Sequence, residues 1–142
     1  MTTICVDASF ILKLVLDEAG SDAVHQLWAA WVAADAELIA PCHALVEAIS
    51  VVRNRVHRQQ LTAEEGATAL AILLEQGIVP VPCDALHARA WELAARFDRP
   101  TAYDAYYLAL AEAADCELWT ADRSLARAVQ DRLPWVKSPP FA

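Results

Sequence analysis

The chain is poor in the residues that mark several common classes of protein. It has three glycines among 142 residues and 57% of its residues are hydrophobic, so we expect a folded globular chain rather than a disordered one. Its four cysteines form no CxxC pair and have no histidine ladder nearby, which argues against a zinc site and against a disulfide scaffold. We interpret Cys5, in a predicted strand, and Cys116, beside another, as small buried hydrophobic residues.

Patterns for secretion and for membrane insertion are missing as well. The first residues, Met1 to Thr3, lack the basic segment that begins a secretory signal. Asp7 and Lys13 interrupt the apolar N-terminal stretch before it reaches the length of a bilayer span. We therefore expect a soluble, cytoplasmic protein with no membrane partner. Its length suits one domain, residues 1–142, with a substantial core, and no repeat or linker divides the sequence.

Basic residues are scarce relative to acidic ones. The chain has 11 lysines and arginines against 19 aspartates and glutamates, which gives a formal net charge of −8 at pH 7. Because phosphate binding usually depends on lysine and arginine, such a chain is a poor non-specific ligand for nucleic acids. Any nucleic-acid function would need a local means of offsetting the negative field.

The order of the predicted elements favours an α/β sandwich with a mostly parallel central sheet of four to five strands. Short β-branched runs predict strands at 3–7, 37–41, 78–82, 117–122 and 134–137. The prolines of 78–82 place that strand at a sheet edge, because proline cannot donate to a strand ladder. Helices are predicted between the strands, and their expected capping residues are Thr62 with Glu65, Asp84 and Thr101.

Four acidic residues occupy informative positions in this scheme. Asp7 ends the first predicted strand and Asp122 ends the fourth, so a parallel sheet would bring both to the rim where ligands bind. Asp104 lies in the first turn of an apolar helix. Glu47 lies within the first two turns of its helix, too deep to cap it, and Arg53 and Arg55 fall on other turns. Because an unpaired buried carboxylate is costly, Glu47 needs a distant cation or a bound metal.

Two interpretations of these acids remain open. Taken singly, Asp7 and Asp122 suit ordinary helix N-caps, and Asp104 would close a capping box with Thr101. Taken together, carboxylates that converge on one rim would raise each other's pKa and repel until a cation arrives. Hard oxygen ligands of this kind suit Mg²⁺ or Mn²⁺, and a bound ion would turn an acidic pocket into a phosphate receptor.

Four segments carry a resemblance to a known family: "TICVDASFILKLVLDE", "PCHALVEAISVVRNRV", "TAYDAYYLALAEA" and "ELWTADRSLARAV". Together they resemble the PIN domain family and, more closely, the VapC-like toxins of type II toxin–antitoxin pairs, over essentially the whole chain. "TAYDAYYLALA" followed by "LWTAD" is the specific part of this signal, whereas "VDAS" alone is weak.

The resemblance implies a Rossmann-like α/β/α fold and a metal-dependent ribonuclease that uses one or two Mg²⁺ or Mn²⁺ ions. RNA hydrolysis in this family implies products with a 5′-phosphate and a 3′-hydroxyl. The family's partner is a small antitoxin protein that blocks the site, and homodimers are common. The family's acidic positions correspond to Asp7, Glu47, Asp104 and Asp122, and its hydroxyl positions near the metal correspond to Ser9 and Thr120.

Substrate contacts and two surface stripes have alternative explanations. The densest basic stretch contains Arg53, Arg55 and Arg58, which would follow an RNA backbone or simply complement the dipole of a solvated helix end. A stripe with Trp28 and Trp31 suits either core packing or a groove for an antitoxin helix.

Two further classes of function compete with a nuclease. One is a non-catalytic module that binds a partner. The intact acidic residues of this chain argue against that class. The other is an aspartyl phosphotransfer domain, which would also place an acid after the first strand. That class usually has a second aspartate close by, and Asp7-Ala8-Ser9 lacks it. Metal titration separates a nuclease from both alternatives.

Overall fold

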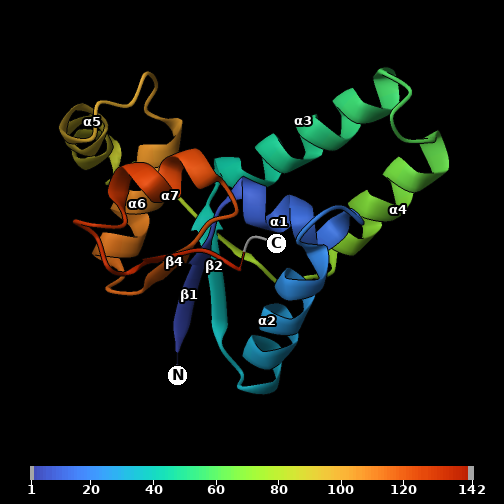
Figure 1. Cartoon of the computed structure of the whole chain (residues 1–142), viewed down its shortest axis with the longest axis horizontal. Coiled ribbons are helices and arrows are strands. Elements are labelled where there is room, and N and C mark those ends of the chain that lie inside the picture. Colours follow the sequence, from blue (N-terminus) through green and yellow to red (C-terminus); the bar gives the residue numbers. More distant parts are fainter. Residues whose placement is uncertain (1, 141–142) are drawn as a thin grey trace.

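The computed structural model describes residues 2–140 as a five-stranded parallel sheet covered by helices on both faces (Figure 1). The strand order is β3-β2-β1-β4-β5, and every pair of neighbours is parallel. The strands are β1 (Thr3–Val6), β2 (Glu37–Pro41), β3 (Val79–Val81), β4 (Glu117–Trp119) and β5 (Val136–Lys137). The predicted α/β/α sandwich with a parallel sheet is therefore confirmed.

The helices form two layers on either side of this sheet. One layer contains α1 (Ala8–Val15), α2 (Ser21–Ala33), α3 (His43–His57) and α4 (Ala63–Leu74). The other contains α5 (His87–Arg96) and α6 (Tyr103–Ala113), while α7 (Arg123–Val129) packs against β5. None of the helices within residues 2–140 combines the length and the apolarity that a bilayer crossing requires.

The core is built on the central strand and on the helix that follows it. Cys5 and Val6 of β1 are completely buried between the two helical layers. Trp28 of α2 is also buried, and Trp31 stacks on Phe10 of α1 with 5.4 Å between ring centroids. Core packing therefore explains the burial of Trp28 and the stacking of Trp31, and an antitoxin groove beside this stripe stays a prediction.

Two local predictions are confirmed by backbone geometry. Strand β3, which contains Pro80, lies at one edge of the sheet and pairs with β2. Thr62 and Glu65 form the predicted capping box at the start of α4. The Glu65 amide donates to Thr62 Oγ1 at 3.0 Å, and the Thr62 amide donates to Glu65 Oε1 at 2.8 Å.

Two predicted caps are wrong for a shared physical reason. Helix α5 begins after Leu86 rather than after Asp84, and α6 begins after Ala102 rather than after Thr101. Leu86 (φ −103°, ψ −13°) and Ala102 (φ −93°, ψ −6°) already have helix-like backbone angles. A side-chain cap needs the extended conformation that Thr62 adopts at φ −72° and ψ 160°. Tight turns therefore replace both caps.

Candidate acidic site at the carboxyl ends of the strands

The strand order creates a switch point between β1 and β4. From β1 the chain builds outward through β2 to β3, and then returns to form β4 and β5 on the other side. Ligands of open parallel sheets bind beyond the carboxyl ends of the strands at such a point. Asp7 follows β1 directly, and its amide donates to the carbonyl of Trp119, the last residue of β4, at 3.2 Å.

Asp7 is both a helix cap and a buried charge. Its Oδ1 accepts hydrogen bonds from the Phe10 amide at 2.9 Å and from Ser9 Oγ at 2.6 Å, so it caps α1. The residue is only 4% exposed. Burial raises the pKa of Asp7 from 3.8 to about 6, the negative charge of Asp104 adds to the rise, and hydrogen bonds from Ser9, Thr120 and Phe10 oppose it. The capping and functional interpretations are therefore compatible here.

Two hydroxyl groups join the end of β1 to the end of β4. Ser9 Oγ donates to Asp7, lies 3.3 Å from Thr120 Oγ1 and accepts a hydrogen bond from the Ala121 amide at 2.9 Å. Thr120 is completely buried, and its Oγ1 accepts from the Asp122 amide at 3.0 Å. This network fixes the Asp7 carboxylate against the loop that follows β4.

Glu47 projects from the second turn of α3 with incomplete hydrogen bonding. Tyr107 of α6 donates to Glu47 Oε2 at 3.3 Å. His43 Nε2 lies 3.5 Å from Glu47 Oε1, yet both of these buried atoms lack a hydrogen-bond partner among residues 2–140. Burial raises the pKa of Glu47, and Asp104 adds to the rise, while His43 and Tyr107 act against it. Glu47 thus has part of the compensation that a buried carboxylate requires.

Asp104 belongs to the same electrostatic neighbourhood. Its charge raises the pKa of both Asp7 and Glu47, so these three carboxylates interact, and we call them the acid site. Asp104 does not cap α6. Its Oδ2 instead accepts a hydrogen bond from Arg99 Nη2 at 3.1 Å, and the Arg99 side chain is only 14% exposed.

Arg99 is a site residue that sequence reasoning missed. It lies in the loop before α6, five residues before Asp104, and no helical or strand period connects the two positions. Arg99 Nε is buried without a hydrogen-bond partner among the described residues 2–140. Arg99, which is only partly satisfied and pairs with Asp104, places a positive charge at this rim.

Asp122 lies at the same rim but has a different set of contacts. Its Oδ1 caps α7 by accepting from the amides of Ser124 at 2.9 Å and Leu125 at 3.2 Å. The described hydrogen bonds connect it to Asp7 through Thr120 and Ser9. The structure therefore brings Asp7, Glu47 and Asp104 together, and places Asp122 beside them as a helix cap.

The donor chemistry of the acid site fits a divalent ion of the Mg²⁺ class. Carboxylate oxygens are the ligands that such ions prefer, and Glu47 Oε1 is a buried acceptor without a partner among residues 2–140. In their present positions, no three His, Cys, Asp or Glu side chains of residues 2–140 are arranged to ligate one ion. The ion pair between Arg99 and Asp104 is one reason for the lack of such an arrangement, because it keeps the Asp104 carboxylate against the Arg99 guanidinium. Metal binding would require a change in side-chain position.

Arg53 and Arg55 of α3 and Arg58, which follows its last residue, have different environments. Arg55 Nη1 forms an ion pair with Glu18 Oε2 at 2.8 Å, which ties α3 to the segment after α1. Arg53 and Arg58 are exposed. An RNA-binding role for these arginines stays a prediction, and Arg55 already has a structural partner.

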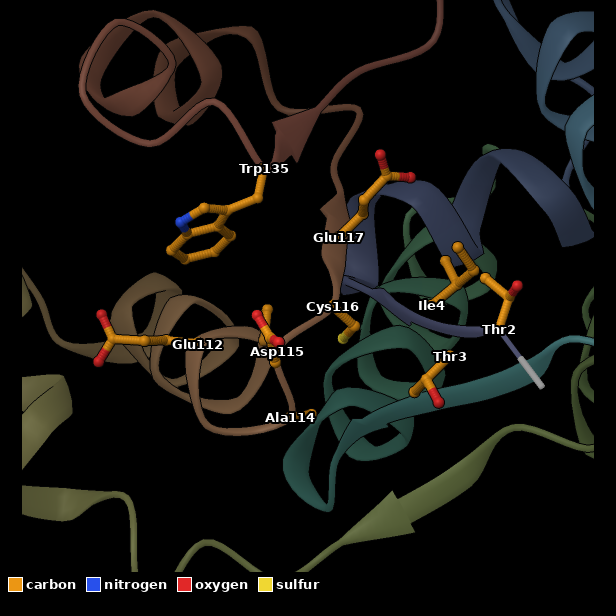
Figure 2. A pocket seen from close by; sticks show the side chains of 10 residues that line it. Thr2, Thr3, Ile4, Glu112, Ala114, Asp115, Cys116, Glu117 and Trp135 are labelled. Carbon is orange, nitrogen blue, oxygen red and sulfur yellow. The ribbon is translucent and has the colours of Figure 1, made fainter.

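A separate pocket lies at the opposite end of the sheet, where the strands begin (Figure 2). It has a volume of about 590 Å³, and its lining includes Thr3, Glu112, Asp115, Glu117 and Trp135. None of the residues of the acid site lines this pocket.

Comparisons with known proteins agree with the fold and with the sequence pattern. Residues 4–130 match the PIN domain family. The chain is 35% identical to Ribonuclease VapC9 of Mycobacterium tuberculosis (strain ATCC 25618 / H37Rv) and to VapC ribonuclease Mb0985 of Mycobacterium bovis. Each match covers 131 residues, 92% of this chain and 94% of the relative.

A solved structure supports the same fold. The crystal structure of Mycobacterium tuberculosis VapC20, a toxin that cleaves the sarcin–ricin loop, matches with a TM-score of 0.67 and 21% sequence identity. The match covers 89% of this chain and 95% of that one.

Proposed function

The chain belongs to the PIN domain family, as a relative of VapC proteins over most of its length, and on this premise we propose that it is a divalent-metal-dependent endoribonuclease. It would hydrolyse RNA phosphodiester bonds as the toxin of a type II toxin–antitoxin pair. The observation that carries this proposal is the acid site, where the charge of Asp104 raises the pKa of both Asp7 and Glu47 beside the switch point of a parallel sheet.

Each residue of the rim has a proposed role. Asp7, Glu47 and Asp104 would hold one Mg²⁺ or Mn²⁺ ion, and Asp122 would complete that site or help hold a second ion. When bound, the metal supplies a Lewis acid for the scissile phosphate and lowers the pKa of an attacking water. Ser9 and Thr120 would fix the orientation of Asp7, and Tyr107 would fix that of Glu47, through the hydrogen bonds described above.

In this proposal, positive charges close to the acid site allow an acidic chain to bind RNA phosphates. A divalent ion would neutralise part of the acid site, and Arg99 is already present there as a buried cation. Exposed Arg53 and Arg58 would contact the RNA backbone farther along α3. Hydrolysis would leave a 5′-phosphate and a 3′-hydroxyl.

Partners and location follow the same premise. We propose a small cognate antitoxin as the protein partner, a homodimer as the toxin assembly, and the cytoplasm as the place of action. The name of the VapC20 neighbour identifies its own target loop, and 21% identity transfers only the fold to this chain.

The test is an RNA cleavage assay with Asp104→Asn and with chelator. Wild-type protein should cleave RNA only with Mg²⁺ or Mn²⁺, and Asp104→Asn should lose cleavage while keeping a wild-type circular dichroism spectrum. Cleavage by Asp104→Asn at the wild-type rate would contradict the assignment of the acid site. A chain that binds no divalent ion and cleaves no RNA would instead favour the non-catalytic module. A stable aspartyl phosphate after incubation with a phosphodonor would favour the phosphotransfer domain.

A further inference from the structure

Two cysteines that are 41 residues apart in sequence meet at the edge of the sheet. Cys42 Sγ lies 3.6 Å from Cys83 Sγ. Cys42 follows β2 and Cys83 comes just after β3, and these strands are parallel, with Pro41 in register with Val81. The Cys42 amide also donates to the Val81 carbonyl at 2.9 Å, which fixes the approach of the two segments. The spacing of the cysteines along the chain does not indicate this pair.

The surroundings of the pair connect it with the acid site. Cys83 Sγ lies 3.6 Å from His43 Nδ1, and the other nitrogen of the same imidazole lies 3.5 Å from Glu47 Oε1. His43 also packs edge-on against Tyr107, whose hydroxyl donates to Glu47. A change at the two sulfurs therefore reaches the acid site through one side chain.

We propose that Cys42 and Cys83 are an oxidation site, at which a peroxide converts the two thiols reversibly into an intramolecular disulfide. A disulfide requires an S–S distance of about 2.05 Å, so the two sulfurs need to approach by about 1.5 Å, which side-chain rotation can supply. Cys42 is exposed and Cys83 is half-buried, so an oxidant in solvent has access to the pair. Cys5 is completely buried and offers no such access.

The chemistry assigns different roles to the two thiols. Cys42 precedes the first residue of α3 and is the more exposed of the two thiols, so it is the one that meets the oxidant first. The Cys42 thiol loses its proton to solvent, and its sulfur attacks hydrogen peroxide. The O–O bond breaks, the sulfur keeps one hydroxyl as a sulfenic acid, and the hydroxide that leaves takes up a proton from solvent to become one water. The Cys83 sulfur then attacks the sulfenic sulfur, forms the S–S bond and expels hydroxide, which takes the Cys83 proton and leaves as a second water. Two thiols are oxidised and one peroxide is reduced.

The disulfide would act on the acid site in a defined way. It would tie the end of the edge strand to the start of α3 and would draw Cys83 away from His43, the neighbour of Glu47. A displacement of about 1 Å in catalytic geometry is enough to slow a reaction by up to about 100-fold. We expect the oxidised chain to cleave RNA at about one tenth of the rate of the reduced chain, or more slowly still. This expectation rests on the proposed function.

The experiment treats the full chain with hydrogen peroxide under non-reducing conditions. The expected product has the mass of a single chain less two hydrogen atoms, with a linked peptide containing Cys42 and Cys83, and dithiothreitol should restore the thiols. The thermal unfolding midpoint should rise by about 5 °C or more on oxidation, because a long loop is closed. Cys42→Ser and Cys83→Ser should lose both effects, whereas Cys116→Ser should keep them.

Several outcomes would overturn this inference. Disulfides only between molecules, oxidation of Cys42 beyond the sulfenic stage without a linked peptide, or thiols protected by a bound zinc ion would each contradict it. These results are read from the mass of the chain and from its thermal unfolding midpoint, so they test the disulfide even if no RNA is cleaved. If the linked chain and the reduced chain cleave RNA at equal rates, the connection to Glu47 is wrong. If the reduced chain cleaves no RNA with metal, the proposed function fails instead.

Discussion

Arg99 and Asp104 form an ion pair at the acid site, with 3.1 Å between Arg99 Nη2 and Asp104 Oδ2. The arginine is the less exposed partner, at 14% against 33% for the aspartate side chain. A cation fixed by the protein and a divalent ion would compete for the same carboxylate. The metal-free state is therefore stabilised by a group that metal binding has to displace or share.

Replacing Arg99 should strengthen metal binding. We expect Arg99→Gln to bind Mn²⁺ roughly tenfold more tightly than wild type, because losing one charged competitor is worth about 1.4 kcal/mol. The same variant should be less stable in chelator, since Asp104 would then lack its cation. Isothermal titration and chemical denaturation measure the two effects. Arg96→Gln is the matched control, because Arg96 is exposed and lies over the Phe97 ring rather than beside the acid site. Equal or weaker Mn²⁺ binding by Arg99→Gln would contradict competition.

Removing the charge of Asp7 should stabilise the metal-free fold. The pKa of Asp7 has its ordinary value of 3.8 in the unfolded chain and is about 6 in the folded chain. Between these two pH values the folded state therefore binds more protons than the unfolded state. Stability therefore falls as pH rises through this window, and the full penalty, about 3 kcal/mol, applies above it. Asp7→Asn keeps a capping side chain and should be more stable than wild type at neutral pH by up to this amount.

The measurement is urea denaturation in chelator across a pH series. The advantage of Asp7→Asn should shrink as pH falls from about 6 and should vanish below 3.8, where wild-type Asp7 is protonated in both states. Exposed Asp17→Asn serves as the control and should show no such trend. A lower stability of Asp7→Asn at neutral pH would mean that the hydrogen bonds from Ser9 and Phe10 outweigh the cost of burial.

The sheet and its acidic rim were predictable because local patterns determine them. Short β-branched runs locate the strands, proline marks the edge strand, and parallel order brings the strand ends together. Asp7 and Asp122 follow from that order alone, since each ends a strand. Asp104 and Glu47 were recognised from family resemblance and from the cost of an unpaired buried acid.

Contacts between distant segments were beyond the reach of sequence patterns. Thr101 has a good capping spacing, yet Asp104 pairs with Arg99 because the Ala102 backbone already turns like a helix. Tyr107 reaches Glu47 across 60 positions, and Cys42 reaches Cys83 across 41. Such pairs depend on how layers pack, and a single sequence records no period for them.

The hydroxyl of Tyr107 should support the metal site through Glu47. Tyr107→Phe keeps the buried ring and removes the hydrogen bond to Glu47 Oε2, so we expect a stability loss of about 1 kcal/mol. We also expect Mn²⁺ affinity to fall about tenfold, because groups that orient metal ligands carry effects of this size. Tyr106→Phe is the control, since its hydroxyl lies 2.7 Å from His87 Nδ1 instead. If both variants weaken Mn²⁺ binding equally, Tyr107 has no specific role in positioning Glu47.

The arginines at the C-terminal end of α3 should separate into one structural residue and two that contact RNA. Arg53→Gln combined with Arg58→Gln should weaken binding of single-stranded RNA and lower the salt dependence of affinity by about 1–2 in log–log slope. Arg55→Gln should leave that slope unchanged and lower stability by about 0.5–1 kcal/mol, because Arg55 pairs with partly exposed Glu18. Fluorescence anisotropy at several salt concentrations, on an Asp104→Asn background, measures binding without cleavage.

The slope distinguishes the two explanations of this basic stretch. Each phosphate contact that is lost lowers the number of counterions released when the protein binds RNA. The slope therefore changes only if the side chains touch the RNA backbone. An unchanged slope in the double variant would mean that Arg53 and Arg58 belong to a solvated helix end, where they complement the dipole of α3. RNA would then have to approach the acid site from another direction, with Arg99 as the cation nearest to Asp104.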